Sequence, residues 1–316
     1  MAKIKLVDTS HWETVDWAVV RPHIYGAINK CTQGTTIVDS KYYSSKNGCI
    51  QTACPWASYH FFAPLSDPIA QANFYVSKVQ GGSKIFVCDV ETTVLNEAIE
   101  RFQPTTSLGR YIKAAKMKAP WRALKELPEE LTKVVEEVIS QYNLSTPLHE
   151  LVNDFCDRVY EQTGYMPWIY SSPYFISSIL KPPAFFGLKY DLWIAHYYVE
   201  EPIIPAPWSS YILHQYTDRG VLPGVIGNID LDNFNGTPQE VVSLFGNGSI
   251  YQYPEYVIVN SPAGLNLRAT NLKGGYIIVA IQNGKELHVI DTKQDEDGRI
   301  RYKIEGWVAS WLTRPK

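Results

Sequence analysis

The triplet Asp89-Val90-Glu91 places two carboxylic acids two residues apart, directly after the apolar run at residues 84–88. That run predicts a buried strand, and residues i and i+2 of a strand point to the same face. Both acids therefore project together, about 6–7 Å apart at Cβ. Acids this close repel when both are ionised, so one is pushed towards its protonated form. One acid can then donate a proton while the other carries negative charge, which is what glycoside cleavage needs.

A D-x-E triplet also occurs at ordinary solvated strand ends and in metal sites, so the elements around it decide its meaning. Strand patterns alternate with helical patterns along the first two-thirds of the chain, which predicts an α/β fold with a parallel sheet, closed or open. The clearest helix is expected at 147–162, with Thr146 as N-cap, Pro147 at its first position and Gly164 as its stop. The expected strands are 4–7, 25–30, 56–62, 84–88, 166–170, 192–196, 210–215 and the region around 227–230, with another helix at 68–79.

Two further acids follow predicted strands that are far apart in the sequence: Asp8 after the first and Asp230 near the last. In a barrel of parallel strands the carboxyl ends meet on one face, where active sites are built. We therefore expect Asp8, Asp89, Glu91 and Asp230 to share one cleft. The residues expected to contact substrate in that cleft are Lys30, Tyr59, Tyr170, Trp193, Tyr197 and Gln215. His60 and His196 are expected to be hydrogen-bonded scaffold residues.

Composition narrows the class of protein. The 316 residues carry a net charge of −3, which offers no general attraction to nucleic acid or to an anionic membrane. The sequence shows no signal peptide and no run of membrane-spanning length, so synthesis as a cytosolic chain is expected. The five cysteines have no paired C-x-x-C spacing, and no metal or cofactor is expected. Cys49 and Cys54 could pair, but nothing in the sequence requires it.

Ordered motifs then resemble a known family. The pieces are Asp8-Thr9-Ser10-His11-Trp12, residues 29–34 (NKCTQG), Tyr59-His60-Phe61, Cys88-Asp89-Val90-Glu91, residues 164–170 (GYMPWIY), 192–197 (LWIAHY), 214–218 (HQYTD) and 227–232 (GNIDLD). Their order and spacing over about the first 235 residues are similar to the family 25 lysozymes, the Chalaropsis-type muramidases. The main departure is the stretch 92–142, an expected insertion where the family has a shorter connection.

The resemblance implies an irregular β/α barrel that cleaves the β-1,4 bond between N-acetylmuramic acid and N-acetylglucosamine. By position, Glu91 matches the general acid and Asp89 the carboxylate that assists it, while Asp8 and Asp230 match the other acids of the cleft. An aspartate could attack the anomeric carbon, or the substrate's own N-acetyl group could do so. Both routes retain configuration, and the sequence leaves the two routes open, with a slight preference for the second.

The C-terminal part has a different character. Residues 1–236 are the expected catalytic domain, and 237–256 are an expected linker with a short helix at 238–245. Short β patterns separated by glycine turns fill 257–316 and predict a small all-β barrel. The segments at 260–269 and 305–312 resemble a bacterial SH3 domain, which implies binding to cell-wall peptides or cross-bridges. Tethering the enzyme to its substrate in this way raises the effective concentration.

The interpretation at this stage is a phage-type endolysin whose partner is bacterial peptidoglycan. It would be made in the host cytoplasm and would reach the wall after a holin opens the membrane; neither nucleic acid nor membrane insertion is expected. The alternative is a non-catalytic wall-binding protein on the same fold. A chitinase is disfavoured because the longer D-x-x-D-x-D-x-E strand motif is missing, and an amidase or peptidase because zinc ligands or a Cys–His pair lack convincing spacing.

Overall fold

The computed structural model covers the whole chain and is described for the parts that follow. These are residues 4–79, 82–91, 129, 133, 134, 137, 146–249, 256–261, 263–268, 277–289, 291–294, 300–304, 307–309 and 313–315. The expected insertion at 92–142 therefore lies almost entirely outside the described residues.

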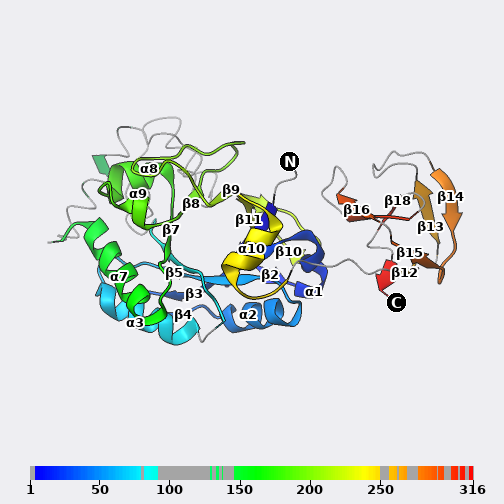
Figure 1. Cartoon of the computed structure of the whole chain (residues 1–316), viewed down its shortest axis with the longest axis horizontal. Coiled ribbons are helices and arrows are strands. Elements are labelled where there is room, and N and C mark those ends of the chain that lie inside the picture. The colour runs from blue at the N-terminus through cyan, green and yellow to red at the C-terminus, as the bar shows by residue number, and fades with distance from the viewer. Residues whose placement is uncertain are drawn as a thin grey trace.

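A closed barrel of eight strands forms the larger part of the chain (Figure 1). The barrel closes because β1 pairs with β3 on one side and with β11 on the other. The strands, in the order in which they pair around the barrel, are β1 (Ile4–Thr9), β3 (Gly26–Gln33), β5 (Trp56–Phe61), β6 (Phe86–Asp89), β7 (Trp168–Ser171), β8 (Leu192–Ala195), β9 (Leu213–Gly220) and β11 (Ile229–Phe234). Each lies at or next to a strand expected from the sequence, and the closed α/β barrel confirms the predicted fold class.

One strand departs from the expected parallel arrangement. β11 runs antiparallel to both of its neighbours, β1 and β9, whereas the other barrel pairs are parallel. The connection from β9 to β11 is short and holds only the small strand β10 (Val225–Ile226). A connection this short makes an antiparallel return, since a parallel crossover needs a dozen or more residues.

Helices cover the outside of the barrel. The longer ones are α2 (Tyr42–Gln51), α3 (Pro68–Val79), α7 (Leu148–Thr163) and α10 (Pro238–Phe245). α7 ends at Gly164 with φ 76°, as predicted, but Pro147 and not Thr146 occupies its N-cap, with no side-chain cap. α10 begins with a capping box between Thr237 and Glu240. Short segments complete the barrel domain: β2 (Thr14–Val15), β4 (Ile37–Val38), α1 (Trp17–Val20), η1 (Arg21–His23), α8 (Pro173–Phe175), η3 (Ile176–Leu180) and α9 (Phe186–Lys189).

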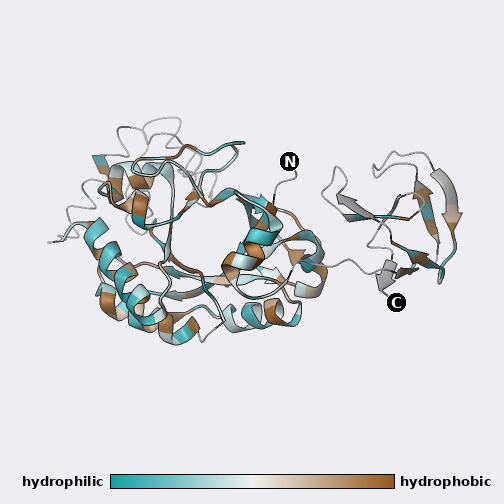
Figure 2. Cartoon of the chain, viewed as in Figure 1, coloured by the Kyte–Doolittle hydropathy of each residue, from teal (hydrophilic) through white to brown (hydrophobic). Residues whose placement is uncertain are grey.

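Apolar side chains fill two layers. One lies inside the barrel and includes Leu6, Ile28 and Val87. The other lies between the strands and the helices, where Val152 and Phe155 of α7 are buried. Figure 2 shows the consequence on the helices, which carry hydrophobic residues together with hydrophilic ones. The five cysteines are free and buried, so Cys49 and Cys54 are not paired.

The described part of the C-terminal region consists of short antiparallel strands. They are β12 (Tyr256–Val259), β13 (Leu265–Arg268), β14 (Ile277–Ile281), β15 (Glu286–His288), β16 (Asp291–Gln294), β17 (Ile300–Lys303), β18 (Trp307–Ala309) and β19 (Thr313–Pro315). These strands form a three-stranded and a five-stranded sheet. Val257, Val259 and Leu265 are among the residues of their small core. The likeness to an SH3 domain and the domain boundaries stay predictions.

Among the helices of the described residues, none has the length and apolar character needed to cross a membrane.

Candidate active site

The predicted acids come from three strands that reach the same end of the barrel. Asp8 is near the end of β1 and Asp89 is the last residue of β6, at the carboxyl ends of parallel strands. Asp230 instead stands at the start of β11, directly opposite Asp8 in the strand register. Because β11 is antiparallel, its first residues lie where the parallel strands end. The reversal of β11 is therefore what brings Asp230 to the same end of the barrel as Asp8 and Asp89.

The side chains of these acids continue the inward face of the barrel. Leu6 and Val87 point into the interior core, so Asp8 and Asp89, two residues later in each strand, point the same way. Extended pairing continues beyond Asp89, since the Val90 amide donates to the Tyr170 carbonyl at 2.9 Å. The pairing keeps Glu91 on the same side as Asp89. Both side chains are buried.

Tyr59 on β5 gives independent evidence that the acids gather. Burial raises the pKa of its phenol well above the ordinary value, and the nearby charges of Asp8, Asp89 and Asp230 raise it further. One phenol therefore senses acids from three different strands. Because its pKa is raised, Tyr59 keeps its proton and stays a neutral hydrogen-bonding group in this cluster.

Gln215 on β9 organises a buried hydrogen-bond network, the floor of the site, which also includes Tyr170, Tyr197 and Asp8. Its Oε1 accepts hydrogen bonds from the hydroxyls of Tyr170, at 2.7 Å, and Tyr197, at 2.8 Å. The Nε2 group of the same amide points to Asp8 and donates to its Oδ2 at 2.6 Å. Tyr170, Tyr197 and Gln215 are all buried. Their contact with substrate stays a prediction.

Trp193 and Asp232 form the next part of this floor. The indole of Trp193 is 1% exposed, and its Nε1 donates to Asp232 Oδ1 at 2.7 Å. Asp232 is fully buried and was not among the predicted site residues. The signal was present in the sequence, because Asp230 and Asp232 have the same i, i+2 spacing as Asp89 and Glu91.

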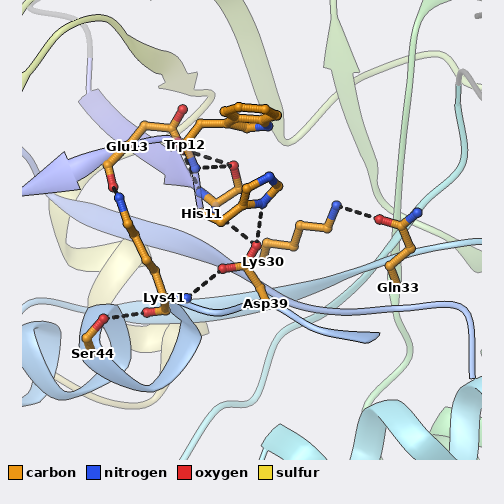
Figure 3. A network of polar contacts seen from close by, with 9 residues as sticks. His11, Trp12, Glu13, Lys30, Gln33, Asp39, Lys41 and Ser44 are labelled. Carbon is orange, nitrogen blue, oxygen red and sulfur yellow. Dashed lines mark hydrogen bonds and ion pairs between the residues drawn. The ribbon is translucent and has the colours of Figure 1, made fainter. Parts of the chain in front are cut away.

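Lys30 on β3 lies beside the cluster. Its Nζ donates to Gln33 Oε1 at 3.0 Å and sits 4.6 Å from the ring centroid of Phe61. Burial lowers the pKa of Lys30, while the charges of Asp89 and Asp39 oppose that shift. Figure 3 shows Lys30 reaching towards Gln33, next to the pair formed by His11 and Asp39.

The loop after β1 is held firmly in this region (Figure 3). Asp39 accepts hydrogen bonds at 3.0 Å from both the backbone amide and the ring Nδ1 of His11. The Lys41 ammonium donates to the Glu13 carbonyl at 2.8 Å. Trp12 stacks obliquely on the His11 ring with 4.5 Å between centroids, yet 68% of its surface is exposed. Trp12 is thus an exposed aromatic ring on a fixed loop near the mouth of the barrel.

A second exposed aromatic, Tyr198, follows β8 on the same end of the barrel. It adopts a left-handed backbone conformation with φ 62°, and its hydroxyl donates to Asp218 at 2.9 Å. Tyr198 is 54% exposed, in contrast to the buried Tyr197 before it. Trp12 and Tyr198 were not among the predicted site residues, because the sequence does not show which aromatic rings reach solvent.

The histidines near the site are structural. His60 bonds to Thr32 through Nδ1 at 2.8 Å and to Gln71 through Nε2 at 3.1 Å. Burial lowers its pKa to about 3, so it stays neutral at ordinary pH. His196 accepts a hydrogen bond from the Ile203 amide at 3.1 Å, and burial lowers its pKa as well. Both observations agree with the expected scaffold role. Within the described ranges, no group of three His, Cys, Asp or Glu side chains is placed to hold a metal ion.

Acids gathered at the carboxyl ends of barrel strands are the kind of site that glycoside hydrolases use. Residues 7–225 match the family described as Glycosyl hydrolases family 25. Since the match spans more than half of the chain, the chain belongs to this family, and it is a glycoside hydrolase.

Similar proteins and solved structures agree with this family assignment. Lysozyme M1 of Streptomyces globisporus is 24% identical over 245 residues, which are 76% of this chain and 71% of that protein. The bacterial lysozyme from Streptomyces coelicolor has a similar fold, with a TM-score of 0.57 at 22% identity over 78% of this chain and 98% of that one. A family GH25 lysozyme from Aspergillus fumigatus gives 0.55 at 21% identity over 77% and 99%. At these identities the two structures establish the fold.

Proposed function

We propose that this chain hydrolyses the β-1,4 bond between N-acetylmuramic acid and N-acetylglucosamine in bacterial peptidoglycan. The observation that supports it most is the convergence of Asp8, Asp89 and Asp230 on Tyr59, with Glu91 two residues beyond Asp89. The family and the likeness to a lysozyme support this substrate class, since lysozyme activity is cleavage of this wall polymer. The acids supply what an oxocarbenium-like transition state needs.

In the proposed mechanism Glu91 is the general acid and protonates the leaving glycosidic oxygen. Positive charge then develops on the sugar ring, and ionised carboxylates close to it stabilise that charge. Asp89 ends β6 two residues before Glu91 and lies on the same side, so it is the carboxylate best placed to assist. It acts on the anomeric carbon or on the acetamide of the substrate, and either route retains configuration.

The test is digestion of purified peptidoglycan by the full chain. Products are reduced with borohydride and identified by mass spectrometry. The proposal predicts new reducing ends at N-acetylmuramic acid only. New ends at N-acetylglucosamine, or peptide cuts alone, would show a different bond specificity. Intact peptidoglycan would favour the non-catalytic wall-binding alternative.

The C-terminal strands are proposed to bind the wall, and the whole chain to act as a phage endolysin released from the host cytoplasm through a holin-opened membrane. Support comes from the SH3-like sequence segments and from the separate small core at Val257, Val259 and Leu265. A version ending at residue 256 keeps the barrel and α10. It should sediment with cell walls less than the full chain does. Equal sedimentation of the two versions would contradict a binding role.

A further inference from the structure

Asp232 is a buried acid that the proposed mechanism does not use. It is 0% exposed and lies on β11 below Asp230. Its Oδ1 accepts the Trp193 indole N–H at 2.7 Å. Its Oδ2 is buried too, and no amide, hydroxyl or cationic donor of the described residues reaches it. A buried carboxylate oxygen without a donor is costly, so its surroundings need explanation.

Asp8 is the neighbouring acid that interacts with Asp232. The β1–β11 register pairs Asp8 with Asp230 and Leu6 with Asp232. Asp8 and Asp232 are therefore diagonal neighbours on the inner face. Their Cα atoms lie about 7–8 Å apart across the two strands, and their side chains are closer. The two carboxyl groups lie within hydrogen-bonding reach of one another. Two carboxyl groups can bond only when one of them holds a proton.

We propose that Asp8 and Asp232 share one proton, with Asp8 Oδ1–H donating to Asp232 Oδ2, and that Asp232 is a positioning residue for Asp8. In this arrangement each of the carboxyl oxygens of the pair has a hydrogen-bond partner. Gln215 donates to Asp8 Oδ2, which is then the carbonyl oxygen of a neutral acid, and Trp193 donates to the charged Asp232. The proton is placed on Asp8 because Gln215 already donates to Asp8 Oδ2 and Trp193 already donates to Asp232 Oδ1. The O–H of Asp8 is then the donor that remains for Asp232 Oδ2.

The surrounding charges favour a shared proton. Asp8 faces Asp232 and Asp230 on β11, Glu13 from the loop after β1, and Tyr59 on β5. Burial and the charge of Asp232 raise the pKa of Asp8 well above its usual range. Burial also raises the pKa of Asp232, opposed by the Trp193 hydrogen bond. A single charge on the pair limits repulsion in a cleft that also contains Asp89 and Glu91.

The pair has a thermodynamic signature that does not depend on the proposed function. Because its folded pKa values are raised, the folded chain binds more protons than the unfolded one, so the stabilisation is lost as pH rises above the usual aspartate range. Asp232→Asn keeps an oxygen for Trp193 and offers an N–H to Asp8, but removes the shared proton. Urea unfolding between pH 4.5 and 8 should therefore show a steeper decline with pH for the native chain than for D232N.

Kinetics separate a positioning role from a purely structural one. On soluble peptidoglycan fragments, D232N should keep KM within about twofold but change the pH profile of kcat, because Asp8 is then ionised where the native chain holds it neutral. Asp232→Leu, which supports neither Trp193 nor Asp8, should lose at least tenfold in kcat, and D232N should restore most of that loss. The control is Asp191→Asn, whose aspartate before β8 has a pKa raised by desolvation alone; its kcat profile should not move.

Two outcomes would overturn the inference. D232N with the native pH dependence of unfolding would mean that no proton is shared. D232L with native kcat and pH profile would mean that Asp232 does not position Asp8. The inference rests on the proposed function only for its kinetic part. If the native chain cleaves no peptidoglycan, the proposed function fails while the unfolding series still decides whether the proton is shared.

Discussion

Gln215 supports three buried groups at once, so its removal should be unusually costly. Gln215→Met keeps the length of the side chain but removes the acceptor of the Tyr170 and Tyr197 hydroxyls and the donor to Asp8. A buried hydrogen bond contributes about 0.5–1.5 kcal/mol. With these three hydrogen bonds lost together, Q215M should lower the free energy of unfolding by about 2–4 kcal/mol.

The tyrosines provide matched controls in the same urea-unfolding assay. Tyr170→Phe or Tyr197→Phe alone leaves one donor on Gln215 Oε1, so each should cost only about 1 kcal/mol. The double variant removes the last donor of the pair, so its cost should exceed the sum of the two single costs, which a double-mutant cycle measures. If Q215M cost less than 1 kcal/mol and the two tyrosine effects were additive, the floor network inferred here would be wrong.

Three further predictions concern other parts of the barrel. Burial lowers the pKa of His60 to about 3, so the free energy of unfolding is highest above pH 6.5 and falls by about 2 kcal/mol at pH 5 through this residue. His60→Gln should flatten this acid slope in unfolding titrations. An unchanged slope would contradict a neutral buried histidine. Trp12→Ala should raise KM for glycan fragments about tenfold with little change in unfolding, as expected for a sugar-stacking ring, while Tyr160→Ala on α7, also an exposed aromatic, should not; equal effects would refute a groove contact. Gly48→Ala would place a Cβ 2.0 Å from Trp17, so it should lower the melting temperature and cost about 1–3 kcal/mol by overpacking; unchanged melting would show that α2 does not pack as described.

Most of the barrel strands could be predicted because they contain a short apolar run followed by polar residues. β9 and β11 carry more polar residues, and their bounds were predicted less closely. The direction of β11 could not be predicted, since a strand has the same side-chain alternation in either direction. Its reversal depends on the short return from β9, a property of the fold rather than of the residues of the strand. Helix α2 was missed because Gly48 and several polar residues interrupt its apolar stripe. Gly48 is there because only glycine fits against Trp17.

The candidate acids could be predicted because they occupy strand ends, whereas the depth of each aromatic ring could not. By residue type, Trp193 and Tyr197 could line a groove or fill the interior, and only packing shows that both are buried. The i, i+2 spacing that identified Asp89 and Glu91 also indicates that Asp232 shares a face with Asp230. The burial of Asp232 depends on the register between β1 and β11. A sequence motif shows which residues share a face, and the closed barrel determines how deep each one lies.

Protonation of the leaving group by Glu91 is the step on which the proposed mechanism depends, and Glu91→Gln is the variant that isolates this step. The variant keeps the shape and loses the proton donor. Its kcat should fall about 10²–10⁴-fold on peptidoglycan fragments. With an activated aryl leaving group, which needs little protonation, the loss should be far smaller. Equal losses on the two substrates, or native activity on peptidoglycan, would contradict the account.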